Sequence, residues 1–316
     1  MSSPRVVALG GGHGLFATLT SLRALTSQIT AIVTVADNGG SSGRLREEFP
    51  IFPPGDLRMA LAALCSDDEW GRSWAEIMQY RFTSEGPLDG HAVGNLLLAA
   101  LWDRDEDPVD GLDRVGALLK VVGRVLPMAG EPLDIEATFF DQGEKRTVRG
   151  QKEVATAPGR FDSLQLIPHN PKARPEALAA IGDADWITMG PGSWISSVLP
   201  HLLVPEQVEA LNKSTATKIL LLNLDDADSG EFSGRSALDH IAAIQKLAPQ
   251  LTFDFVAADS SIVLDPEAGK LLEEKVSTQG GELIVRDLRL DRSGNHHDTK
   301  KLTSLFAHIA EKTLVG

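Results

Sequence analysis

The chain has one cysteine, Cys65, and few aromatic residues: 11 Phe, 5 Trp and 1 Tyr among 316 residues. A single cysteine excludes a disulfide framework within the chain and is typical of proteins kept in a reducing cytoplasm. The scarcity of aromatic rings disfavours binding of single-stranded nucleic acid through base stacking.

Basic residues are fewer than acidic ones: the chain has 30 Lys and Arg against 44 Asp and Glu, so its formal charge is −14. A chain of that charge repels a polyanion, so we expect no nucleic-acid partner, although locally basic pockets are allowed. Long apolar runs are absent too. Leu96–Trp102 is far short of the roughly 20 residues of a membrane span, and Val6–Leu9 is too short for a signal peptide. We expect a cytoplasmic protein without membrane insertion.

The chain opens with a strand, a glycine turn and a helix. Arg5–Leu9 is a β-branched apolar run typical of a buried parallel strand, and Gly10–Gly14 interrupts it. Leucines then recur at helical spacing as far as Leu25, and Ile29–Val35 predicts a second buried strand. Strand, helix and strand in this order form a right-handed βαβ unit.

The same pattern of strand and loop returns later in the chain. Further strands are predicted at Asp185–Met189, Thr217–Leu222 and Thr252–Ala257, and a helix capped by Asp298 at Thr299–Leu314. Between the two halves, residues 56–123 indicate helices and 124–150 a hairpin that turns at 141–143. We therefore expect an α/β fold: one domain over 1–316 with a Rossmann-like three-layer α/β/α core, a mostly parallel sheet, and an inserted helical and hairpin subdomain over approximately 56–160.

Two glycine loops follow predicted strands and are candidate phosphate sites. The first contains Gly11, Gly12, His13 and Gly14 and fits the dinucleotide pattern Gly-x-Gly-x-x-Ala, in which backbone and helix N-terminus approach a phosphate. Asp37 follows at the distance expected of an acid that binds ribose hydroxyls. The pattern leaves the nucleotide open, including a nicotinamide cofactor. The second loop, with Gly192 and Ser193, suits a phosphate or a sugar.

The segment Thr34–Arg46 predicts a flexible binding loop, because three glycines and two serines follow a strand and two arginines come next. Its candidate ligand residues include Asn38, Ser41 and Arg44. Asp56 is expected to cap the next helix, and Arg58 is expected to face an anion, since a cation in a first helical turn opposes the helix dipole.

His91 and Asn95 stand four residues apart at the start of an apolar helix. His91 is a candidate general base, whereas the alternative is a histidine that is merely hydrogen-bonded in the core with Asn95. Asp56 is the other catalytic candidate. Asp225 and Asp226 are candidate Mg²⁺ ligands, and a solvated acidic turn explains them equally well.

These motifs together resemble the bacterial gluconeogenesis factor family, the YvcK-like proteins. They occur in the family's order over residues 5 to about 302: Gly10–Gly14, Thr34–Arg46, Pro53–Arg58, Gly90–Leu98, Gly190–Pro200 and His297–Asp298. The resemblance implies a cytoplasmic factor needed for growth and cell shape on gluconeogenic carbon sources, with members that bind uridine diphosphate sugars. It also implies that Asn223 lies near the ligand, on the strand end beside the second glycine loop.

The wider superfamily is similar to 2-phospho-L-lactate transferase, a CofD-like enzyme that uses Mg²⁺ and a guanylated donor. The chain has Asn38 where the family usually has an aspartate, which removes one potential metal ligand. Two hypotheses follow. The first is a factor that binds a nucleotide sugar such as uridine diphosphate N-acetylglucosamine, with no certain cofactor. The second is an Mg²⁺-dependent transferase; a homo-oligomer is open in both.

Overall fold

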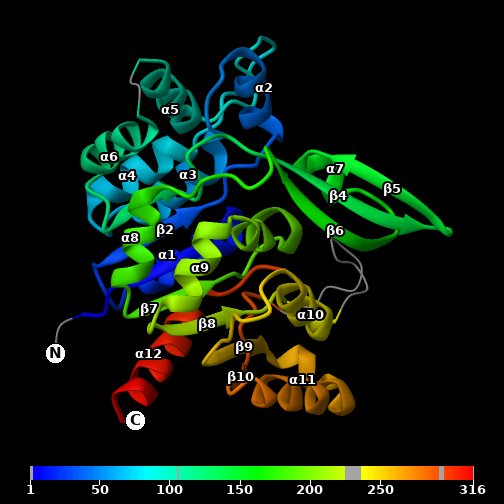
Figure 1. The fold of residues 1–316 in the computed structure, drawn as a ribbon. Coiled ribbons are helices and arrows are strands. Elements are labelled where there is room, and N and C mark those ends of the chain that lie inside the picture. The colour runs from blue at the N-terminus through cyan, green and yellow to red at the C-terminus, as the bar shows by residue number, and fades with distance from the viewer. Residues whose placement is uncertain (1–2, 105–106, 225–235, 292–294, 316) are drawn as a thin grey trace.

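The computed structural model describes residues 3–104, 107–224, 236–291 and 295–315 (Figure 1). Its centre is a seven-stranded sheet in the order β10-β9-β8-β7-β1-β2-β3, in which every neighbouring pair is parallel. The strands are β1 Val6–Gly10, β2 Ile29–Val33, β3 Arg124–Pro127, β7 Trp186–Met189, β8 Thr217–Leu221, β9 Phe255–Asp259 and β10 Glu282–Arg286.

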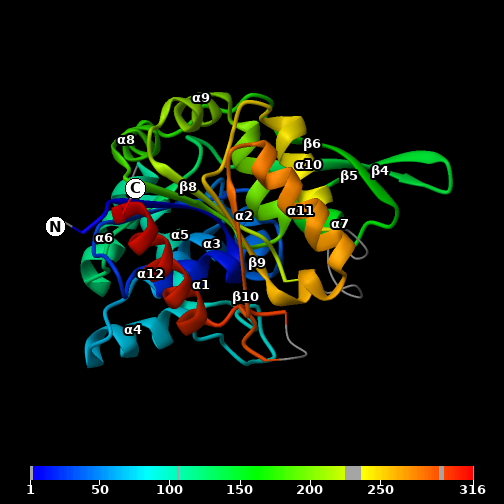
Figure 2. The same ribbon diagram turned by 90° about the horizontal axis from the view of Figure 1, so that it is seen from below.

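Helices cover both faces of this sheet, as the predicted three-layer core requires. Figure 2 shows α1, α3 and α12 on one side and α8, α9 and α10 on the other. The helices are α1 Gly12–Leu22, α2 Gly40–Glu48, α3 Pro54–Ala63, α4 Glu69–Gln79, α5 Val93–Arg104, α6 Pro108–Leu119, α8 Pro175–Asp183, α9 Pro205–Lys213, α10 Ala237–Leu247, α11 Pro266–Thr278 and α12 Thr299–Val315. The α/β fold is confirmed.

The apolar patterns have the expected structural cause. All five residues of β1 are buried, and Leu15, Leu19 and Leu22 of α1 are each at most 1% exposed, so the helix packs its leucine stripe on the sheet. Asp298 accepts hydrogen bonds from the backbone N–H groups of Lys300 and Lys301 at 2.7 and 3.1 Å, which confirms the predicted cap of α12. In the described part of the chain, no helix is both long and apolar enough to cross a membrane.

A second, antiparallel sheet projects from the core (Figure 1). Its order is β5-β4-β6, formed by β4 Asp134–Asp141, β5 Glu144–Arg149 and β6 Arg160–Ile167, with the short helix α7 Gln151–Ala155 before β6. The hairpin turn falls where the sequence predicts it, because Gln142 and Gly143 both have positive φ, as a two-residue turn requires.

Two sequence boundaries differ from this structure. Arg124–Pro127, predicted as part of the hairpin, pairs with β2 in the main sheet, whereas the second sheet continues beyond residue 160 to Ile167. Thr34–Arg46 is not a flexible loop throughout, because Gly40–Glu48 is the helix α2. Glycine and serine have low helix propensity, so the sequence does not predict this helix. Its buried residues Ser41, Ser42 and Leu45 give it a face that packs against the core.

The order of the strands reverses at β1. From β1 the chain builds outward through β2 and β3 on one side, and then from β7 to β10 on the other. Open α/β sheets bind ligands at such a reversal, at the carboxyl ends of the strands, because the flanking loops diverge to opposite faces there. The carboxyl ends of β1 and β7 therefore form the expected ligand-binding edge of this sheet.

Candidate functional site

The two predicted glycine loops meet at this reversal. An added Cβ on Gly14 would stand 2.5 Å from the carbonyl carbon of Pro191 and 2.8 Å from Gly192 Cα, so only glycine lets the loops touch. Gly12 has φ +59° and an open space beside its Cα, where an added Cβ would meet only Asp56 Oδ1, at 3.9 Å. The loop after β1 thus leaves room at the start of α1.

Asp56 faces that space and does not cap its own helix. The helix α3 begins two residues earlier, at Pro54, because proline at the first helical position fixes φ and needs no donor. The carboxylate of Asp56 instead accepts hydrogen bonds from the Thr34 hydroxyl, at 3.3 Å, and from the Gly12 N–H at the start of α1. The predicted cap is therefore wrong, and Asp56 serves the N-terminus of a different helix.

Burial and the charge of Asp37 raise the pKa of Asp56 to about 7, against hydrogen bonds from Thr34 and Gly12 that lower it. Asp37 Oδ1 accepts from the Gly39 N–H at 2.7 Å, which fixes this carboxylate ahead of α2. An added Cβ on Gly55 would stand 2.7 Å from Asp37 Oδ2, so the Asp37 carboxylate lies against the residue that precedes Asp56. Asp56 therefore titrates near neutral pH.

Ser41, His91 and Asn95 form one buried hydrogen-bonded group. The Asn95 amide donates to Ser41 Oγ at 3.0 Å, and Ser41 Oγ lies 2.9 Å from His91 Nδ1. Since Ser41 Oγ receives the amide hydrogen, its own hydrogen is available to His91 Nδ1. Burial and the charges of nearby arginines lower the pKa of His91, so the ring is a neutral base at pH 7. This geometry fits a general base at His91, and it also fits a histidine that is only hydrogen-bonded in the core.

The predicted arginines separate into two kinds. Arg44 donates to the carbonyl oxygens of Pro87 and Asp89, at 3.3 and 2.6 Å, and so holds the loop before α5. Arg58 lies 3% exposed among the acids, and its pKa falls to about 10 through burial and the charge of Arg81, although Asp56 and Asp37 oppose the shift. Arg58 is thus the buried arginine of the two, and its Nη1 donates to Gln79 Oε1.

The remaining candidates arrange the loops. Asn38 donates to Glu153 Oε2 at 3.0 Å and accepts from the Lys152 N–H at 3.1 Å, which ties α7 to the end of β2. Asn223 exchanges two hydrogen bonds with the backbone of Gly192, at 2.7 and 2.8 Å, and so fixes the second glycine loop. Ser193 Oγ accepts from the Ser196 N–H at 3.3 Å. Asp225 and Asp226 lie outside the described residues.

Comparison with known proteins places this geometry in a family. The sequence model of 2-phospho-L-lactate transferase CofD matches residues 6–295. The chain belongs to the CofD family. A Mycobacterium leprae protein, named provisionally as a gluconeogenesis factor, is 45% identical over 96% of this chain and 86% of its own length. The gluconeogenesis factor of Listeria innocua is 34% identical over 98% and 97%.

A crystal structure from Bacillus halodurans has the same fold. It superposes with a TM-score of 0.83 and 33% sequence identity, over 97% of this chain and all of that one. A second crystal structure from the same organism, described as a member of the upf0052 family, gives a TM-score of 0.82. Within the CofD family, this chain therefore belongs with the bacterial gluconeogenesis factors.

Sequence reasoning missed three residues at the site of this CofD-family protein. Thr34 holds Asp56, and the His296 ring stands edge-on to His13 with centroids 5.9 Å apart. Arg81 contributes its charge to the surroundings of His13, Arg58 and His91. No local motif marks Arg81, whereas Thr34, a hydroxyl at the end of a strand beside the glycine loop, carried a signal that could have been used.

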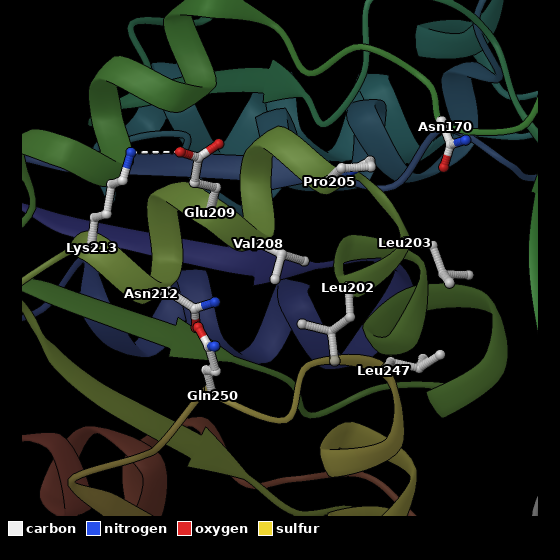
Figure 3. Close-up of a pocket in the computed structure, with 10 residues that line it drawn as sticks. All are labelled: Asn170, Leu202, Leu203, Pro205, Val208, Glu209, Asn212, Lys213, Leu247 and Gln250. Atoms are coloured by element: carbon white, nitrogen blue, oxygen red, sulfur yellow. Dashed lines mark hydrogen bonds and ion pairs between the residues drawn. The ribbon is translucent and has the colours of Figure 1, made fainter.

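One cavity of the protein lies away from this site. It has a volume of about 670 Å³ and lies along α9 and the 3₁₀ helix Leu199–Leu203 (Figure 3). Its wall combines apolar and polar side chains: Asn170, Leu202, Leu203, Pro205, Val208, Glu209, Asn212, Lys213, Leu247 and Gln250. None of the predicted site residues lines it, so we place the candidate site at the strand reversal, where the titratable groups gather. No group of three potential metal-ligating side chains exists among the described residues.

Proposed function

We propose that this chain is a cytoplasmic gluconeogenesis factor that binds a nucleotide sugar such as uridine diphosphate N-acetylglucosamine and supports growth and cell shape on gluconeogenic carbon sources. The relatives named for this role match nearly the whole chain, and its single cysteine suits a reducing compartment. The observation that carries the binding proposal is the meeting of two glycine loops at the strand reversal.

The diphosphate rests beside Gly12, at the start of α1, with Arg58 as a counter-charge. Because the pKa of Asp56 is about 7, this side chain is protonated in a large share of molecules and then donates a hydrogen bond to a phosphate oxygen. The ionised form repels the same phosphate. Binding without metal therefore weakens as the pH rises through about 7.

The test is calorimetric titration with uridine diphosphate N-acetylglucosamine, with and without Mg²⁺. Saturable binding without Mg²⁺, with the ligand recovered unchanged, supports the proposal. Gly12→Leu should abolish binding, whereas Gly143→Leu is the matched control, since Gly143 has φ +88° and open space in the distant β4–β5 turn. Absence of binding at millimolar ligand overturns the proposal.

A second candidate function is an Mg²⁺-dependent transferase that acts on a guanylated donor. The approach of the Asp37 and Asp56 carboxylates favours it, because Mg²⁺ commonly takes one or two carboxylates together with substrate phosphates. These residues fit such an ion only when Asp56 is ionised. Nucleotide affinity in the presence of Mg²⁺ would then rise with pH, opposite in sign to the metal-free case, and Asp56→Asn would abolish the rise.

A further inference from the structure

Arg81 is an exposed cation held in place by backbone contacts. It forms an isolated antiparallel bridge with Ala92, and its Nη1 donates to the carbonyl oxygen of Gly90 at 2.8 Å. Among the described residues, no carboxylate lies within ion-pair distance of it. A carbonyl fixes the position of a guanidinium but leaves its positive charge intact.

Arg58 is a second cation beside it, and this one is buried. Its Nη1 donates to Gln79 Oε1, whereas its Nε is shielded from solvent and has no hydrogen-bond partner in the described part of the chain. The stem packs tightly, since an added Cβ on Gly94 would stand 2.8 Å from Arg58 Cγ. A buried guanidinium with an unused donor costs stability unless another acceptor supplies the missing bond.

Arg58 and Arg81 both contact the segment 90–94, since Arg81 bonds to Gly90 and pairs with Ala92 while the Arg58 stem packs on Gly94. Burial lowers the pKa of Arg58 most, and the charge of Arg81 lowers it further. Burial likewise lowers the pKa of His13 at the start of α1, followed by the charges of His296, Arg58 and Arg81. Like charges persist together in a folded protein when a ligand of opposite charge joins them. Of the two acids that act on Arg58, Asp56 is only partly ionised at neutral pH, so the two guanidinium groups still favour a small anion.

We propose that Arg58 and Arg81 form one anion subsite that binds a phosphate group of the ligand, with Arg58 as the buried wall and Arg81 as the exposed wall. The inference that the ligand is a nucleotide sugar rests on the proposed function. The inference that the subsite binds a phosphate group does not. Arg81 thereby becomes a binding residue that the sequence motifs do not mark, and Gly90 O becomes its positioning contact.

The alternative role for Arg81 is purely structural, because its bond to Gly90 also holds the loop before α5. Asp89→Ala is a control for that role. It removes the acceptor that binds the Ser84 N–H at 3.0 Å, so it loosens the same loop without removing a cation. If Arg81 only holds the loop, Arg81→Met and Asp89→Ala should change binding alike.

The experiment titrates wild type, Arg81→Met, Arg81→Lys and Asp89→Ala with uridine diphosphate N-acetylglucosamine and with inorganic pyrophosphate. Titrations are run at roughly 0.05 and 0.3 M salt, a range over which exposed charges become screened. We expect Arg81→Met to weaken binding of both probes at least about tenfold at low salt and to flatten the salt dependence. Arg81→Lys should recover part of the affinity, and Asp89→Ala should stay within about threefold of wild type.

Each outcome separates the anion subsite from the proposed function. If wild type binds pyrophosphate but not the nucleotide sugar, and Arg81→Met abolishes pyrophosphate binding, the subsite stands and the nucleotide-sugar proposal falls. If the nucleotide sugar binds and Arg81→Met equals wild type or Asp89→Ala, the subsite is wrong and the function stands. If wild type binds neither probe, both are wrong.

Discussion

Replacing Gly14 by alanine separates the packing of the two glycine loops from ordinary helix propensity. Gly14 lies in the first turn of α1, where propensity alone would make alanine stabilising by up to about 1 kcal/mol. The new Cβ would collide with backbone atoms of Pro191 and Gly192, which cannot rotate away as a side chain does. Overpacking of this kind costs about 1–3 kcal/mol, so the two arguments predict opposite signs.

The assay is thermal unfolding of Gly14→Ala beside Gly182→Ala. Gly182 lies in α8, and nothing stands within 4 Å of its added Cβ, so this control should be neutral or slightly stabilising. Since 1 kcal/mol shifts Tm by roughly 2–4 °C in chains of about 150–250 residues, we expect Gly14→Ala to melt a few degrees lower and to bind the nucleotide sugar more weakly. A Gly14→Ala protein as stable as Gly182→Ala would refute the contact between the loops.

Three further substitutions test the site and its support. Because the pKa of Asp56 is higher in the native state than in the unfolded state, the free energy of unfolding falls as the pH rises from about 4 to about 7. Asp56→Asn should flatten this pH dependence in urea titrations and stabilise the protein by on the order of 1–3 kcal/mol at pH 8. Equal pH dependence in wild type and variant would contradict this prediction. Asp259→Ala should lower the free energy of unfolding by about 3–5 kcal/mol, because the 2%-exposed carboxylate pairs with Arg289, and a loss below about 1 kcal/mol would argue against that pair. Asn223→Asp should lower Tm at neutral pH, because a carboxylate would then face the Gly192 carbonyl oxygen and could not donate to it. At acidic pH the protonated Asp can donate again, so Tm should return toward that of wild type. A loss of Tm that is the same at all pH values would contradict the two hydrogen bonds between Asn223 and Gly192.

The sequence was informative wherever the cause of a structure is local. A glycine loop between a β-branched run and a leucine stripe predicts strand, turn and helix, because backbone permissiveness and side-chain period both act within a few residues. The end of each strand then predicts which loops share the carboxyl edge of a parallel sheet. That argument predicts Gly12, Asp37 and Gly192 at one edge, and the strands that precede them, β1, β2 and β7, are neighbours in the sheet.

Pairing between distant residues was not accessible in this way. Asp56 stands where a helix cap is expected, yet it accepts a hydrogen bond from Gly12 of α1. The reason is that α3 begins earlier, at Pro54, and that Thr34, just after β2, donates to Asp56. Arg44 is predicted from the sequence to bind a ligand, yet its side chain donates to the carbonyl oxygens of Pro87 and Asp89. Such partners depend on how separate elements pack, which residue type and spacing do not encode.

The partners of the arginines explain how a strongly acidic chain can offer an anion site. Arg44 and Arg81 are held by backbone carbonyls, and a carbonyl, unlike a carboxylate, orients a cation without cancelling its charge. Asp56, whose charge acts on the buried Arg58, has a pKa of about 7 and is therefore only partly charged at neutral pH. These arginines thus keep their positive charge in a chain whose formal charge is −14, and this combination favours a compact phosphate ligand over a nucleic acid.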